Sequence, residues 1–312
     1  MTGQLDDQLG LDEWAAIARR NSRSVQTLIG WIFWDPEAVK RYGELGLPGG
    51  LGYIASRAAP FSGAGAEAVN AAFGSISPMG IGIVFAQLGE ASNFLPYWRA
   101  RNEAVIQGLK SFAPGTTELL SEWRIDLWNA VAQLPTVGRP NFASHLSYDR
   151  VDDGGLDGWH AVNAIREWRG DTHWAIVASH GLRGSEASIL HNSWLGYDAN
   201  WLSLSRGNSP ESIAAAWSSL ERKGLASAGT VTAQGLLLRQ QIEDETDALG
   251  AEIWRTLGYD RSEAFGREFE PPCELLLERV NITAGILYQP ASRIRESSNK
   301  AQFLKSTSDC QR

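Results

Sequence analysis

Residues 209–249 constrain the fold more than any other stretch, because they hold the start and stop signals of two helices in a fixed order. Ser209 is a favourable N-cap residue, and Pro210 falls at the first helical position, where a missing N–H group does not weaken the helix. Gly224 predicts the left-handed residue that ends a helix. We therefore expect a helix that begins at Pro210 and ends at Gly224.

A short ribbon and a longer helix follow Gly224. The segment Leu225 to Val231 predicts two strands with a bend near Ala228-Gly229, and Thr232 predicts the cap of the second helix. A helix, a glycine stop, a two-stranded wing and a long helix occur in this order in a winged helix-turn-helix. The apolar residues of the second helix are Leu236, Leu237, Ile242 and Leu249.

Two further stretches support a family resemblance. The segment SLERKGL…TAQGLLLRQQIEDETDAL resembles the end of a MarR-type winged helix. GYIASRAAP at 52–60 and WHAVNAIREWRGDTHWAIVASHGL at 159–182 are similar to a largely uncharacterised actinobacterial family with a MarR-like helix-turn-helix domain. This resemblance implies a mainly α fold, with a helical N-terminal half packed on a MarR-like winged-helix C-terminal half. Because some members lie near antibiotic-biosynthesis genes, it also implies a place in natural-product metabolism.

The charges of the winged segment argue against DNA as the partner. A DNA-binding surface needs cations, because neutralising phosphates supplies most of its non-specific affinity. Arg222 and Lys223 are balanced by Glu211 and Glu221, and the wing itself has no lysine or arginine. The whole chain carries a net charge of −8. We therefore expect the winged shape to be kept while nucleic acid is not bound.

The remaining composition bounds the domain organisation and the compartment. Only two cysteines occur among the 312 residues, and they are too far apart in the chain to predict a disulfide framework or a zinc site. No apolar run is long enough to span a membrane, so we expect a cytoplasmic protein without a membrane partner. The prolines and glycine of 134–140 predict a boundary, which gives a helical domain at 1–135, a winged helix-turn-helix-like domain at 136–260, and a C-terminal helix with a flexible tail at 261–312.

Two local features predict breaks between helices. Gly170 and Asp171 have the character of a C-cap followed by an N-cap, so residues 155–170 and 171–182 predict two helices that meet at a tight corner. Pro271-Pro272 predicts the end of a polar loop, with a final helix from Cys273 to Leu287.

The helical pair contains the best candidates for chemistry. His160, Asn163 and Glu167 are spaced three and four apart and share one helical face, and the corner would bring His173 close to them. A histidine beside a carboxylate can perform general acid–base catalysis. Two alternatives remain open. His160, Glu167 and His173 could bind zinc or iron, or these polar groups could satisfy one another between helices.

Candidate binding residues come from an arginine and from the thirteen tryptophans. Arg57 lies in a small, apolar segment, so it needs either a carboxylate partner or an anionic ligand. Tyr53 is a weaker companion of Arg57. Trp34, Trp159 and Trp174 could form the walls of a pocket, with Asn163 contributing a polar contact, or the tryptophans could simply fill the core.

These observations lead to three functional hypotheses. The first is an enzyme of natural-product metabolism that binds a small organic metabolite and catalyses an isomerisation, cyclisation or elimination by acid–base chemistry without an organic cofactor. Nucleotide, nicotinamide and covalent serine or cysteine motifs are absent from the sequence, which agrees with this hypothesis. The second is a MarR-like, ligand-responsive transcriptional regulator, which would be a symmetric homodimer. The third is a non-catalytic metabolite-binding or resistance protein.

Overall fold

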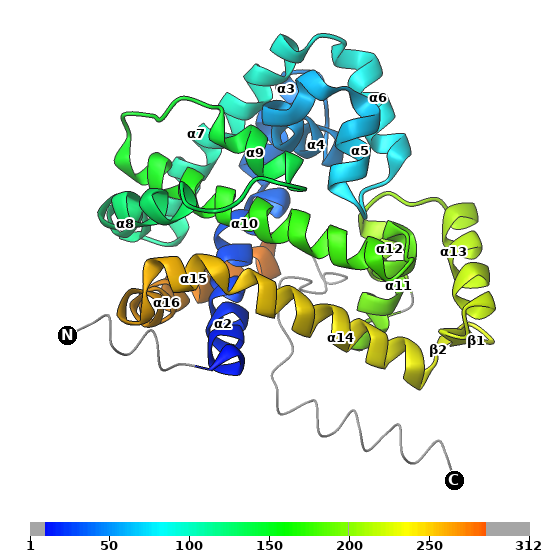
Figure 1. Cartoon of the computed structure of the whole chain (residues 1–312). Coiled ribbons are helices and arrows are strands. Elements are labelled where there is room, and N and C mark those ends of the chain that lie inside the picture. The colour runs from blue at the N-terminus through cyan, green and yellow to red at the C-terminus, as the bar shows by residue number, and fades with distance from the viewer. Residues whose placement is uncertain (1–9, 199, 285–312) are drawn as a thin grey trace.

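The computed structural model describes residues 10–198 and 200–284, and within them it is almost entirely helical (Figure 1). This confirms the predicted mainly α fold. The elements are α2 (Leu11–Gly30), η1 (Trp31–Trp34), α3 (Pro36–Glu44), α4 (Gly50–Ala58), η2 (Ala59–Ala64), α5 (Ala66–Phe73), α6 (Pro78–Leu88), η3 (Ala91–Phe94), α7 (Leu95–Phe112), α8 (Thr116–Val131), α9 (Pro140–Leu146), α10 (Gly154–Ser179), α11 (Gly184–Leu195), α12 (Trp201–Ser205), α13 (Pro210–Arg222), β1 (Ala226–Ser227), β2 (Thr230–Val231), α14 (Ala233–Gly250), α15 (Glu252–Leu257) and α16 (Tyr259–Thr283).

One long helix, α10, runs through the middle of the molecule (Figure 1). It continues without a break through Gly170 and Asp171, so the predicted corner between two helices is wrong. The reason is tertiary packing: α10 contacts α2, α8, α9 and α14, and burial on several sides outweighs a weak local stop signal. The carboxylate of Asp171 accepts a hydrogen bond from the backbone N–H of Phe142, so Asp171 caps the start of α9 instead.

Helix α10 lies unusually close to α8, because glycines replace side chains where the two backbones meet. A Cβ atom at Gly158 would lie 2.1 Å from the carbonyl oxygen of Leu120. A Cβ atom at Gly155 would lie 2.9 Å from the carbonyl oxygen of Thr117. These positions therefore require glycine for a steric reason, while the helix would otherwise favour alanine.

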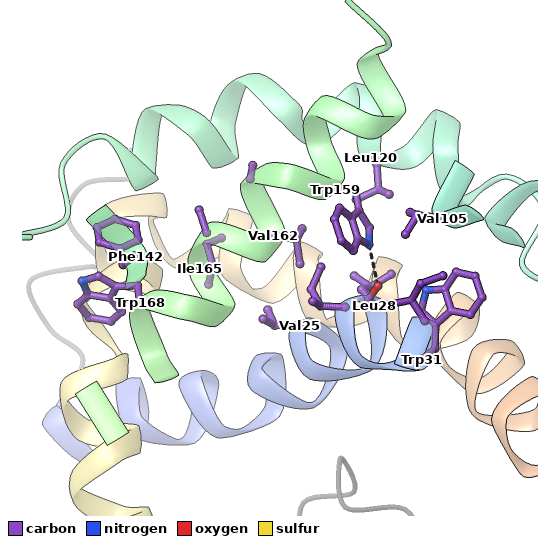
Figure 2. Packing of buried hydrophobic residues seen from close by; sticks show 14 of the residues in the cluster. Val25, Leu28, Trp31, Val105, Leu120, Phe142, Trp159, Val162, Ile165 and Trp168 are labelled. Carbon is purple, nitrogen blue, oxygen red and sulfur yellow. Dashed lines mark hydrogen bonds between the residues drawn. The ribbon is translucent and has the colours of Figure 1, made fainter. Parts of the chain in front are cut away.

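A first hydrophobic core fills the space between α2, α7, α8, α10 and α16. Tryptophans form much of it (Figure 2). Trp159 is fully buried there, and its indole N–H donates to the carbonyl of Leu28 over 2.8 Å. Trp31 and Trp168 are also buried in this core. The alternative that tryptophans fill a core is thus confirmed for several of them.

A second, smaller core belongs to what we call the winged half, residues 184–250, and includes Ile176 and Val177 from the end of α10. We call α2–α9 with α15 and α16 the helical body. The two cores do not follow the predicted domain boundaries at 135 and 260, because the first core takes residues from all three predicted segments. The predicted flexible tail falls in 285–312, which lies outside the described residues.

The winged half forms as its sequence predicts. The hydroxyl of Ser209 accepts a hydrogen bond from the N–H of Ser212 at the start of α13, and Gly224 adopts a φ of 73° after its end. The strands β1 and β2 pair antiparallel, and Ala228 and Gly229 between them both have positive φ. The hydroxyl of Thr232 caps α14.

Helix α16 differs from its prediction. It begins at Tyr259 and passes through Pro271 and Pro272, where a loop was expected. Phe265 and Phe269 on one side of the prolines, and Cys273 on the other, are buried against the first core, so packing keeps the helix continuous. None of the helices in the described part of the chain is long and apolar enough to cross a membrane.

Candidate ligand-binding site

A pocket of about 780 Å³ lies between the helical body and the winged half. Its walls come from α2, η1, α4 and α6 on one side and from α11, α12 and α14 on the other, with α10 crossing between them. This volume falls within the range of small-molecule sites. The pocket therefore has the size and the position expected of a ligand site shared by two halves.

Aromatic rings form one wall of the pocket. Phe33 packs edge-on against Trp34 and Tyr53, with ring centroids 4.6 Å and 4.7 Å away. Trp34 of the helical body stacks on Trp201 of the winged half, with centroids 6.4 Å apart. Because all four residues line the pocket, this wall is aromatic and is built from both halves.

Three exposed apolar residues mark the edge of the pocket. Met79 and Ile83 from α6 are 62% and 42% exposed, and Leu204 from α12 is 56% exposed, yet all three line the pocket. The pocket therefore opens to solvent between α6 and α12.

Arg57 and Glu167 form a buried ion pair in the wall. The Nε and Nη2 atoms of Arg57 donate to the two carboxylate oxygens of Glu167 over 3.1 Å and 2.8 Å. Asn141 and Arg166 donate to the same carboxylate. Burial alone would raise the pKa of Glu167, but the guanidinium groups of Arg57 and Arg166 hold it well below its usual range. Of the two partners that the sequence allowed for Arg57, the structure shows the carboxylate.

A second ion network joins α10 and α14. Arg169 donates to Glu243 and to Asp247, each over 2.8 Å, and Arg239 also donates to Glu243. Arg19 of α2 donates to Asp247 as well. Alternating charges thus connect α2, α10 and α14, and Arg169, Arg239 and Glu243 of this network line the pocket.

Two histidines of the pocket hold opposite tautomers. The hydroxyl of Thr246 donates to the carbonyl of Ile242, so it can only accept from Nδ1 of His173, 3.1 Å away. His173 therefore carries its proton on Nδ1 and has a free lone pair on Nε2. Nδ1 of His191 lies 3.0 Å from Nε of Arg239, which is a donor only, so His191 carries its proton on Nε2.

Burial keeps both imidazoles neutral. It lowers the pKa of His173 to about 3, and the nearby Arg239 contributes to this shift. Burial and Arg239 likewise lower the pKa of His191 well below its ordinary value. The pocket therefore offers one imidazole acceptor and one imidazole donor at neutral pH. His191 was not among the candidates from the sequence, where it stands alone in a helix without a recognisable motif.

The structure separates the predicted catalytic and binding residues into two groups. One group does not line the pocket. His160 lies on the same face of α10 as Glu167 but about 10 Å along the axis, and its Nε2 lies 3.2 Å from Oδ1 of Asn102. Trp159 belongs to the core, and the buried amide of Asn163 has no partner in the described part of the chain. The group that lines the pocket is Trp34, Tyr53, Arg57, Glu167, His173 and Trp174.

The predicted metal alternative does not assemble. His160 lies outside the pocket, while Glu167 and His173 line it. Within residues 10–198 and 200–284, no group of three or more His, Cys, Asp or Glu side chains is placed to hold a metal ion.

The surface of α13 and the wing offers few cations to a nucleic acid. Lys223 at the end of α13 donates to both carboxylate oxygens of Glu186 in α11. Arg222 is exposed, but so are Glu211 and Glu221 on the same helix. The exposed wing residues carry no charge. The described residues of α13 and the wing therefore carry acidic as well as basic exposed side chains.

Comparison with protein families identifies the family of this chain. The model of a family described as a helix-turn-helix family matches residues 18–283. No curated protein and no solved structure matches the chain.

Proposed function

This chain belongs to the helix-turn-helix family, and we propose that it binds a small organic molecule in the pocket between the helical body and the winged half. The observation that carries the proposal is the pocket of about 780 Å³ with its aromatic wall. Sites of this size, mostly apolar with a few convergent polar groups, are typical of ligand binding. The aromatic wall that contains Trp34 and Trp201 favours a cyclic, largely apolar molecule.

Calorimetric titration with 2-naphthol, a neutral bicyclic probe, tests the proposal. Gly30 lines the pocket, and a Cβ atom there would meet no other atom within 4 Å, so Gly30→Phe places a ring in the cavity. Gly43 on α3 is equally unhindered but exposed, so Gly43→Phe is the matched control. We expect binding by the wild type and by Gly43→Phe and none by Gly30→Phe. Equal binding by all three proteins, or none by the wild type, contradicts the proposal.

One form of the proposed function is acid–base catalysis on the bound molecule. The free Nε2 lone pair of His173 is the proposed proton acceptor, and the Nε2–H of His191 is the proposed donor to a developing oxyanion. Glu167 is locked by Arg57 and Arg166, so we assign it a positioning role. His160 contributes no group to the pocket and has no role in this scheme. The isomerisation, cyclisation or elimination predicted for natural-product metabolism belongs to this form.

Deleting the gene in its host and complementing the deletion tests the catalytic form while the substrate is still unidentified. We expect a compound to accumulate in the deletion strain, to disappear with the wild-type gene, and to persist with His173→Gln. Full complementation by His173→Gln contradicts acid–base catalysis by His173. The third hypothesis, a binding or resistance protein without turnover, would then remain.

The second candidate function is a ligand-responsive, MarR-like transcriptional regulator. The family membership favours it, and so does the position of the pocket, because α11, α12 and α14 of the winged half line it. A ligand that bridges the two halves would couple its binding to the placement of α13. The scarcity of cations on α13 and the wing weighs against it.

A gel shift separates the two candidates. A regulator would bind a palindromic site in its own upstream region as a homodimer, with strong salt dependence. The absence of any shift at micromolar protein in low salt would remove the regulator.

A further inference from the structure

The charges on the pocket wall do not balance. Five arginines and two glutamates line it. Arg57, Arg166, Arg169 and Arg239 each bind a carboxylate. The fifth, Arg206, has no carboxylate within ion-pair distance in the described part of the chain. It follows α12, at the junction of the two halves.

Neutral acceptors hold Arg206 in place. Its Nε donates to the hydroxyl oxygen of Ser75 over 2.9 Å, and its Nη1 donates to the carbonyl of Leu202 over 3.1 Å. Its Nη2 donates to no residue in the ranges that the structure describes. Because Ser75 accepts from Arg206, the proton of its hydroxyl is free to donate. One N–H edge and one O–H group are therefore available side by side.

The backbone around this pair is also fixed. The N–H of Ser77 donates to the carbonyl of Arg206 over 2.9 Å, and the amide of Asn208 donates to the carbonyl of Ser75 over 3.2 Å. These bonds join the loop between α5 and α6 to the loop between α12 and α13. Arg206 and Ser75 are thus held in place before any ligand arrives, which favours tight binding.

Two other arginines of the pocket wall, Arg57 and Arg166, lie near Arg206. Burial lowers its pKa to about 10, with the nearby Arg57 and Arg166 contributing to the shift and Tyr53 opposing it. The guanidinium still stays charged at neutral pH. Arg206 is partly buried and has no carboxylate partner in the described residues, so an anion brought by the ligand would gain an ion pair that the protein itself does not supply.

We propose that Arg206 and Ser75 bind the carboxylate of a planar, apolar organic acid whose ring system lies on the Trp34–Trp201 wall. This inference rests on the proposed function of the pocket. The planar fork of a guanidinium matches a carboxylate. Among the arginines that line the pocket, Arg206 alone has no carboxylate partner in the described residues, which matches a ligand with a single negative charge.

Two isosteric probes, 2-naphthoate and 2-naphthamide, test this inference by calorimetric titration. They share one ring system and differ in charge. We expect the wild type to bind 2-naphthoate at least about tenfold more tightly than 2-naphthamide, since a charge-assisted hydrogen bond is roughly twice as strong as a neutral one. In Arg206→Met the preference disappears, while the affinity for 2-naphthamide changes by less than about twofold. Arg222→Met, which removes an exposed arginine of α13, is the control and keeps the preference.

Further variants distinguish the outcomes. Ser75→Ala keeps Arg206 but removes the hydroxyl, so we expect the preference for 2-naphthoate over 2-naphthamide to decrease without disappearing. This variant tests the inference even if Arg206→Met does not fold. If both probes bind the wild type equally and Gly30→Phe abolishes both, the pocket binds ligands but the carboxylate assignment is wrong. A preference that survives Arg206→Met also overturns it. If neither probe binds the wild type, both the inference and the proposed function are wrong.

Discussion

Lys223, at the end of α13, donates hydrogen bonds to both carboxylate oxygens of Glu186 in α11, over 2.9 Å and 2.7 Å. Its third proton reaches the carbonyl of Gly181. The charge of Lys223 is therefore balanced by a carboxylate of the same half, and the contact joins the end of α13 to the start of α11.

Adding cations to the wing should raise its affinity for DNA. Ser227 and Thr230 are exposed wing residues, and Ser227→Arg/Thr230→Arg adds two charges there. We expect non-specific duplex binding to become detectable at low salt, with a salt slope steeper by roughly 2, one for each new phosphate contact. Fluorescence anisotropy with a labelled duplex measures it. The control is Thr136→Arg/Val137→Arg, which adds the same charge in an exposed loop far from the wing in sequence. We expect this control not to bind the duplex. If both double variants bind the duplex with equal affinity, net charge and not the wing determines binding.

Thr246 should determine the tautomer of His173. In Thr246→Val the acceptor for Nδ1–H is lost, so we expect the proton to distribute between Nδ1 and Nε2. Thr246→Ser retains the hydroxyl and should retain the wild-type tautomer. Long-range ¹⁵N–¹H NMR spectra of the histidine rings report the tautomer directly. An unchanged ring spectrum in Thr246→Val would mean that another group holds the imidazole.

Breaking the Arg57–Glu167 pair should destabilise the fold strongly. Arg57→Met leaves Glu167 buried with only Arg166 and Asn141, and removing one partner of a buried pair costs about 3–5 kcal/mol of unfolding free energy. Urea unfolding followed by tryptophan fluorescence measures the loss. Arg222→Met, an exposed change, should alter stability by less than about 0.5 kcal/mol. If Arg57→Met lowers the unfolding free energy by an equally small amount, the Arg57–Glu167 ion pair is not essential to the fold.

The unfolding free energy should fall steeply as the pH falls below about 6.5. Burial lowers the pKa of His145 to about 4 and that of His173 to about 3, so below the ordinary value the unfolded chain binds protons that the folded chain does not. Asp171 acts in the opposite direction, because burial raises its pKa to about 7 and its contribution decreases as the pH rises from about 4 to 7.

Urea unfolding between pH 5 and 8 measures this dependence. His145→Asn preserves a donor to the carbonyl of Asn141 but cannot titrate. We expect it to reduce the slope near pH 5 by roughly 1.4 kcal/mol per pH unit. An identical slope in the variant would show that His145 titrates normally in the folded protein.

Gly158 should tolerate no side chain. In Gly158→Ala the new methyl group would lie 2.1 Å from the carbonyl oxygen of Leu120, so α8 and α10 must separate. We expect a loss of about 1–3 kcal/mol or more in unfolding free energy. Gly43→Ala, on an exposed and unhindered face of α3, should instead stabilise by about 0.5–1 kcal/mol. Thermal unfolding of the two variants compares them, and a neutral Gly158→Ala would mean that the helices repack without loss.

The sequence predicted those parts of the fold whose signals are local. Ser209, Gly224 and Thr232 act on the residues next to them, so the helix, wing and helix formed as expected. Gly170 and Pro271 also predicted breaks, but α10 and α16 continue through them, because burial on several sides stabilises a continuous helix. No pattern in the sequence reports how many sides of a helix will be covered.

The candidate site was predicted only in part, for a similar reason. Arg57 was recognised as needing a partner because it stands among small apolar residues, and Glu167 and His173 were recognised from helical spacing. Arg206 lies in the polar stretch between α12 and α13. An arginine in such a stretch is ordinarily exposed to solvent. Only the docking of that loop on residues 75–77 turns it into a pocket residue.

The unbroken α10 has a consequence for any attempt to dissect the molecule. Its early turns are wedged against α8 by glycines, and its last turns supply Ile176 and Val177 to the smaller core. A fragment that starts after residue 180 would lack Ile176 and Val177. A fragment that starts at residue 150 would expose to water the side of α10 that packs against α2 and α8. We therefore expect neither fragment to fold alone, and we expect the two cores to unfold together in one cooperative transition.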